Sequence, residues 1–61
     1  MTKFLSCWYS ESVAILYTLY PNGNCYKRDI MKDTKAIPIS KEEYKQAYDL
    51  AKYADYFEEG E

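Results

Sequence analysis

The sequence predicts an α+β fold in which a three-stranded antiparallel meander, with an optional short fourth strand, packs against one C-terminal helix. Three segments rich in β-branched and aromatic residues occupy the first half of the chain, and polar residues separate them. The second half begins with a helix N-terminal signal and continues with apolar residues at helical spacing. A chain of 61 residues has room for one domain, so we expect residues 1–61 to form a single α+β domain.

The predicted strands cover residues 3–9, 13–20 and 25–31, and a polar loop is expected over 32–35. Segment 36–39 is a further short extended stretch. Its proline cannot donate a backbone hydrogen bond, which restricts this stretch to a sheet edge or to the approach to the helix.

Between the second and third strands, the segment Pro-Asn-Gly-Asn at 21–24 predicts a tight hairpin turn. A two-residue turn on its central Asn-Gly would pair Tyr20 with Cys25. Alternatively, its Pro-Asn forms a type I turn in front of a left-handed Gly23, which pairs Tyr20 with Asn24. We favour this bulged form because the fixed φ of proline suits the first corner of a type I turn.

The helix start is the most strongly specified feature of the chain. Ser40 is the predicted N-cap, with Glu43 reaching back to it in a capping box, and Ile39 and Tyr44 occupy the positions of a hydrophobic staple. The apolar stripe that follows contains three alanines, which would let the helix approach the sheet closely; it consists of Tyr44, Ala47, Tyr48, Ala51 and Ala54.

Acidic residues crowd the end of the chain, where the helix dipole disfavours them. We therefore expect residues 57–61 to fray, with Gly60 ending any helix that remains.

A helix that covers one face of a sheet leaves the other face for function. The odd-numbered residues of the second strand are larger and more uniformly apolar, so we assign them to the core. In the bulged register the other face gathers the predicted partner-binding residues Leu16, Tyr20, Tyr26, Arg28 and Ile30. Depending on its register, the first strand adds either Leu5 with Tyr9 or Phe4 with Trp8. A face this apolar indicates an interaction site, unless residues 32–39 cover it.

The predicted helix offers a second candidate surface. Tyr53 and Tyr56 lie off its core stripe, where they either shield the sheet edge or bind a partner. In the second case they would act together with the acidic residues Asp49, Asp55, Glu58 and Glu59.

The sequence disfavours catalysis and metal binding. It contains no histidine and only two, widely separated cysteines, whereas zinc sites use four Cys or His ligands in close pairs. No nucleophile motif is present and the usual general base is missing. We therefore expect no catalytic residue, no metal and no cofactor.

The cysteines also bear on location. Cys7 and Cys25 would be separated by the second strand, although a disulfide needs Cα atoms within about 7 Å. We therefore expect both thiols to be reduced, which is typical of cytoplasmic proteins. No segment has the apolar length of a signal peptide or a membrane span.

The net charge of −2 is divided along the chain. Residues 1–41 hold six Lys or Arg and three Asp or Glu, whereas residues 42–61 hold two and seven. Asp29 and Asp33 interrupt the basic side chains, which disfavours nucleic acid as a partner.

These features predict a non-enzymatic protein-binding module whose partner is another protein, a second copy of the chain, or both. The surplus aromatic face of the sheet and the acidic, tyrosine-bearing helix make an inhibitor or adaptor that blocks a host protein the leading interpretation. A phage or mobile-element origin is suggested only by association, because small acidic chains with this many tyrosines, eight of 61 residues, are common there.

Two rival interpretations stay open. One is a nucleotide-binding or sequestering protein with a pocket between identical subunits, in which tyrosines stack on bases and Lys27 and Arg28 hold phosphates. The other is a homo-oligomeric structural protein.

Overall fold

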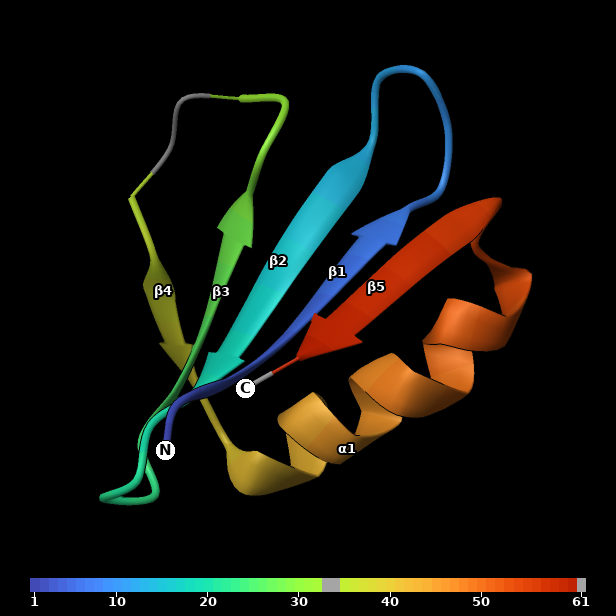
Figure 1. Ribbon diagram of the computed structural model, residues 1–61. Coiled ribbons are helices and arrows are strands. Elements are labelled where there is room, and N and C mark those ends of the chain that lie inside the picture. The colour runs from blue at the N-terminus through green and yellow to red at the C-terminus, as the bar shows by residue number, and fades with distance from the viewer. Residues whose placement is uncertain (33–34, 61) are drawn as a thin grey trace.

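The residues described by the computed structural model, 1–32 and 35–60, form one antiparallel sheet of five strands and one α-helix (Figure 1). The elements in chain order are β1 (Lys3–Trp8), β2 (Ala14–Leu19), β3 (Cys25–Asp29), β4 (Ile37–Ile39), α1 (Lys41–Leu50), a 3₁₀ turn η1 (Ala51–Tyr53) and β5 (Tyr56–Gly60). The sheet order is β4-β3-β2-β1-β5. The predicted α+β class and the short fourth strand are confirmed, whereas β5 was not predicted.

The hairpin between β2 and β3 takes the bulged form that the sequence favours. The N–H of Gly23 donates to the carbonyl of Tyr20, and the N–H of Tyr20 donates to the carbonyl of Asn24, both at 2.9 Å. Gly23 has a φ of +92°, a conformation that glycine adopts without steric cost. The even-numbered side chains of β2 and β3 therefore share one face, as predicted.

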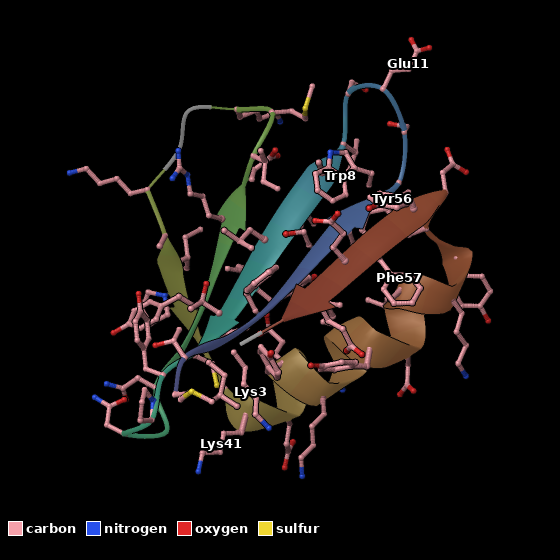
Figure 2. The ribbon with its side chains drawn as sticks, in the orientation of Figure 1. Lys3, Trp8, Glu11, Lys41, Tyr56 and Phe57 are labelled. Carbon is pink, nitrogen blue, oxygen red and sulfur yellow. The ribbon has the colours of Figure 1, made fainter. Side chains whose placement is uncertain are left out.

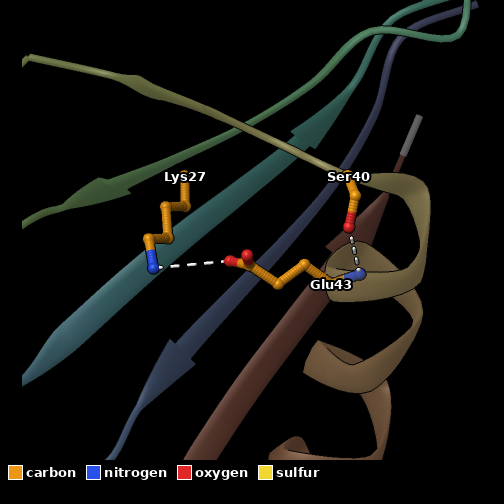
Figure 3. Close-up of polar contacts among 3 residues, drawn as sticks. All are labelled: Lys27, Ser40 and Glu43. Carbon is orange, nitrogen blue, oxygen red and sulfur yellow. Dashed lines mark hydrogen bonds and ion pairs between the residues drawn. The ribbon is translucent and has the colours of Figure 1, made fainter.

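Helix α1 begins at the predicted cap. The side-chain oxygen of Ser40 accepts a hydrogen bond from the backbone N–H of Glu43 at 3.1 Å. The Glu43 carboxylate, predicted to reach back to Ser40, instead lies 3.4 Å from Nζ of Lys27 on β3 (Figure 3). A cation is a stronger partner for a carboxylate than a neutral N–H. The expected hydrogen bond from the Ser40 N–H to the Glu43 carboxylate is therefore replaced by an ion pair between the helix and β3.

The C-terminal part of the chain differs from the prediction. Helix α1 ends at Leu50, η1 follows, and Ala54 is already extended with a ψ of 147°. The N–H of Asp55 donates to the carbonyl of Trp8 at 2.9 Å, and residues 56–60 pair with β1 as β5. The prediction that the chain frays from residue 57 and that Gly60 ends a helix is therefore wrong as far as residue 60. Glu61 lies outside the described residues.

The physical reason for β5 is the edge that β1 would otherwise expose. An unpaired edge leaves N–H and C=O groups without partners in the sheet, and pairing with β5 satisfies those of β1. Phe57 adds an apolar side chain opposite Cys7. Gly60 leaves room for a ring, because a Cβ at that position would lie 2.8 Å from the ring of Phe4.

The core lies between α1 and one face of the sheet. Its buried members are Leu5, Cys7, Tyr17, Cys25, Tyr44, Ala47 and Ala51. Tyr17 belongs to this cluster and Ile15 and Leu19 pack against it, which confirms the assignment of the odd face of β2 to the core. Val13, also assigned there, precedes β2 and is exposed.

The remaining predictions concern the cysteines and β4. Cys7 and Cys25 are free, buried thiols on β1 and β3, and β2 lies between these strands. Pro38 lies in edge strand β4 as predicted. Residues 37–39 extend the sheet beside β3, so the alternative in which this segment covers the sheet is wrong for these residues. Two residues of the predicted 32–35 loop, 33 and 34, lie outside the described residues.

Candidate functional site

The face of the sheet that points away from α1, which we call the open face, carries an aromatic surface. It consists of the even-numbered residues of β1, β2, β3 and β5, extended by a residue beyond two strand ends. Its large side chains are Phe4, Trp8, Leu16, Tyr20, Tyr26, Arg28, Ile30 and Tyr56.

Two ring pairs mark the two ends of the open face. Trp8 and Tyr56 pack across β1 and β5 with ring centroids 5.4 Å apart (Figure 2). At the hairpin end, Tyr20 and Tyr26 meet edge to face with centroids 5.5 Å apart. Such contacts hold rings in place before a partner arrives, which reduces the entropy lost on binding.

Charged residues flank the middle of the open face. The register aligns four residues in a row across β5, β1, β2 and β3, namely Glu58, Ser6, Leu16 and Arg28. Three strand spacings of ~4.8 Å separate the backbones of Glu58 and Arg28 by roughly 14 Å. The Glu58 carboxylate accepts a hydrogen bond from the Tyr56 hydroxyl at 2.5 Å, and this bond raises the pKa of Tyr56.

Large side chains on the open face stay in contact with solvent. Tyr56 is 54% exposed and Tyr20 43%, whereas the smaller Ser6 and Ala14 are almost completely buried. On the open face the small residues are therefore covered, while the aromatic rings protrude into solvent. Aromatic residues are enriched at protein interfaces because they combine a large apolar body with a polar tip.

Six of the seven predicted partner-binding residues lie on the open face. The bulged register brings together Leu16, Tyr20, Tyr26, Arg28 and Ile30. Tyr56 joins them from β5, although the sequence predicted it on the helix. Tyr53 does not lie on the open face, because it belongs to η1, where its side chain is 79% exposed.

Phe4 and Trp8 complete the open face, and Leu5 enters the core. The sequence left these two alternatives for β1 open, because both sets of alternate residues in this strand are apolar or small. Glu58 was missed as an open-face residue, since only its place in β5 brings it there.

The predicted acidic surface on the helix does not form. Glu58 and Glu59 belong to β5, where successive side chains point to opposite faces. Glu58 therefore lies on the open face, while Glu59 lies opposite Leu5 on the face that carries α1.

The predicted phosphate-binding pair is separated for the same reason. Lys27 lies on the helix face, where it pairs with Glu43, and Arg28 lies on the open face. Within one chain these two cations therefore do not converge on a ligand.

Burial lowers the reactivity of the buried titratable groups. It raises the pKa of the Cys7 thiol above its ordinary value of 9.0, so this thiol stays protonated and weakly nucleophilic at neutral pH. It also raises the pKa of Tyr9 to about 12. The buried Tyr9 hydroxyl interacts with the Cys7 thiol, a weak hydrogen-bonding group, and has no nitrogen or oxygen partner among the described residues.

Two further findings apply to residues 1–32 and 35–60. No group of three or more His, Cys, Asp or Glu side chains within them could hold a metal ion. No helix that they form is long and apolar enough to cross a membrane.

Compared with known protein families, curated proteins and solved structures, the chain gives no match.

Proposed function

We propose that the protein is a small non-enzymatic, cytoplasmic protein-binding module that docks on another protein through the open face, in the manner of an inhibitor or adaptor. One observation carries this proposal: α1 covers one face of the sheet, while the other face presents two aromatic ring pairs to solvent. An apolar patch of this kind on a small domain is typical of an interaction site.

The composition of the open face supports the same proposal. Trp, Tyr and Arg are the residues that most often supply the binding energy of protein interfaces, and Trp8, Tyr20, Tyr26, Tyr56 and Arg28 all lie here. The charges of Glu58 and Arg28 flank the centre and would fix the orientation of a partner. The partner surface is therefore apolar in the middle, with charges of opposite sign on its two sides.

Affinity capture with two matched variants tests the proposal. Leu16→Asp places a charge in the middle of the open face, where docking would bury it without a partner. Tyr53→Asp introduces the same charge in η1, away from that face. We expect the wild-type chain and Tyr53→Asp to recover the same stoichiometric protein from a bacterial lysate, and Leu16→Asp to recover less than a tenth as much.

Far-UV circular dichroism of the purified variants confirms that each is folded. Equal capture by Leu16→Asp and the wild type would contradict the assignment of the open face. Failure of the wild type to recover any stoichiometric protein would contradict the proposal itself.

Self-association is a second candidate, favoured by the positions of Glu58 and Arg28. A two-fold axis parallel to the strands and through the middle of their row would place Arg28 of each copy against Glu58 of the other. Such a dimer would also bury apolar surface that a 61-residue domain exposes when alone.

Light scattering over a range of protein concentrations tests this candidate. Arg28→Glu should shift the chain toward monomer, and the double variant Arg28→Glu/Glu58→Arg should restore the dimer because it exchanges the two charges. A wild-type chain that is monomeric at all concentrations would exclude self-association.

A further inference from the structure

A cleft lies where the start of α1 meets the β2–β3 hairpin and the start of β1, and it reaches the open face only at Tyr20. Its volume is about 520 Å³, within the roughly 300–1,000 Å³ range of small-molecule sites. Residues that line it include Lys3, Leu19, Tyr20, Lys41, Lys45 and Tyr48.

Three lysines give the cleft a positive charge. Lys3 comes from β1, and Lys41 and Lys45 come from successive turns of α1; Figure 2 shows Lys3 and Lys41 at the same end of the molecule. No acidic residue of the described part of the chain lines the cleft. Within that part, none of the three ammonium groups lies within 4.0 Å of a carboxylate oxygen.

The hairpin turn helps to position one of these cations. A Cβ on Gly23 would lie 3.2 Å from both Cε and Nζ of Lys41. The Lys41 side chain therefore lies directly against the turn, with its ammonium group beside the backbone of Gly23. The glycine that the turn needs for its positive φ also leaves room for this lysine.

Aromatic and apolar side chains form the rest of the cleft. Tyr48 is 39% exposed, and its ring is held against Tyr44, with centroids 5.5 Å apart and the two hydroxyl oxygens at 3.3 Å. Tyr20 is held by Tyr26 on the other side of the hairpin end. Leu19 and Pro21 lie nearby in the lining. A flat ring can pack on such a surface while a charged group meets the lysines.

We propose that this cleft binds a small phosphorylated molecule with a flat aromatic ring, the chemistry of a nucleoside phosphate. A phosphate monoester carries a charge of about −1.5 to −2 and three acceptor oxygens, which complements the three lysines that line this cleft. Lysine binds phosphate as a point charge without demanding a planar geometry. The lysines of this site lie outside the open face, and only Tyr20 belongs to both surfaces, so the proposal does not depend on the proposed protein-binding function.

The test uses the full chain and three probes, namely AMP, adenosine and inorganic phosphate, at low ionic strength. AMP should raise Tm in a saturable manner, by about 5–10 °C at ten times Kd. It should also shift the backbone amide NMR signals of Lys41 and Tyr48. Adenosine and inorganic phosphate should each bind at least tenfold more weakly than AMP.

Two variants with the same charge change locate the site. Lys41→Glu should weaken AMP binding at least tenfold, and it suits the fold because an acidic residue is favourable in the first turn of a helix. Lys52→Glu lies in η1 outside the cleft and should change the affinity less than twofold. Leu16→Asp should bind AMP as the wild type does, which separates this site from the open face.

The outcomes that overturn the proposal are specific. If AMP at 10 mM neither raises Tm nor shifts the NMR signals, the cleft is not such a site. Equal binding of adenosine would exclude recognition of the phosphate, and equal binding of inorganic phosphate would exclude recognition of the ring. Equal weakening by Lys41→Glu and Lys52→Glu would mean that only overall charge attracts the anion.

Discussion

Truncation of one leucine on each face of the sheet distinguishes the core from the open face. Leu5 of β1 is fully buried beneath α1, whereas Leu16 of β2 is only partly buried on the open face. Both changes, Leu5→Ala and Leu16→Ala, remove the same atoms from a strand. Their effects on stability therefore differ only through the surroundings of the two side chains.

The expected magnitudes follow from these surroundings. A fully buried leucine replaced by alanine costs about 2–5 kcal/mol, because it loses transfer free energy and leaves a cavity. Leu16 is already in contact with water, so its truncation should cost about 1 kcal/mol. A domain of this length has a free energy of unfolding of roughly 3–9 kcal/mol, so Leu5→Ala removes a large part of it.

Urea denaturation and thermal unfolding measure both effects. Trp8 is the only tryptophan of the chain, and its ring contact with Tyr56 makes its fluorescence a probe of unfolding, alongside far-UV circular dichroism. At roughly 4–8 °C per kcal/mol, Leu5→Ala should lower Tm by at least about 8 °C. A smaller effect for Leu5→Ala than for Leu16→Ala would refute the assignment of the core to the helix face.

Three further predictions concern the cap, β5 and alkaline pH. Ser40→Ala should lower the free energy of unfolding by about 1 kcal/mol in urea titrations, because it removes the N-cap hydrogen bond; an unchanged value would argue against this cap. Gly60→Ala should cost about 1–3 kcal/mol because its Cβ forces the Phe4 ring to move, and the cost should shrink in a Phe4→Ala background, as a double-mutant cycle would show. Burial raises the pKa of Tyr9 to about 12 and also raises that of Tyr44, whereas in the unfolded chain both lose their protons near 10. The folded state then binds more protons above pH 10, so stability should fall as pH rises from about 10 to 12. Tyr9→Phe should reduce this fall because it removes one of these two groups with a raised pKa; an unchanged fall in the free energy of unfolding would argue against a raised pKa of Tyr9.

The candidate surface was largely predictable because the bulged turn sets the register of β2 and β3. The special φ of Gly23 and the fixed φ of proline act within four residues, and the register they impose places Tyr26 and Arg28 beside Leu16. Tyr56 was predicted to bind a partner, but from a surface on the helix and not from the open face. Its position on the open face follows from pairing with Trp8, a contact that no local pattern encodes.

The sequence by itself determined the features that depend on near neighbours: the α+β class, the bulged hairpin, the Ser40 cap and the buried face of β2. These rest on backbone preferences, alternation along a strand and hydrogen bonds between residues a few positions apart. The tertiary structure decided three other features: the strand conformation of 56–60, the partner of Glu43 and the three-lysine cleft. Each depends on contacts between elements far apart in the chain. Local charge correctly disfavoured a helix at the C-terminal end, but only the free edge of β1 could turn that segment into a strand.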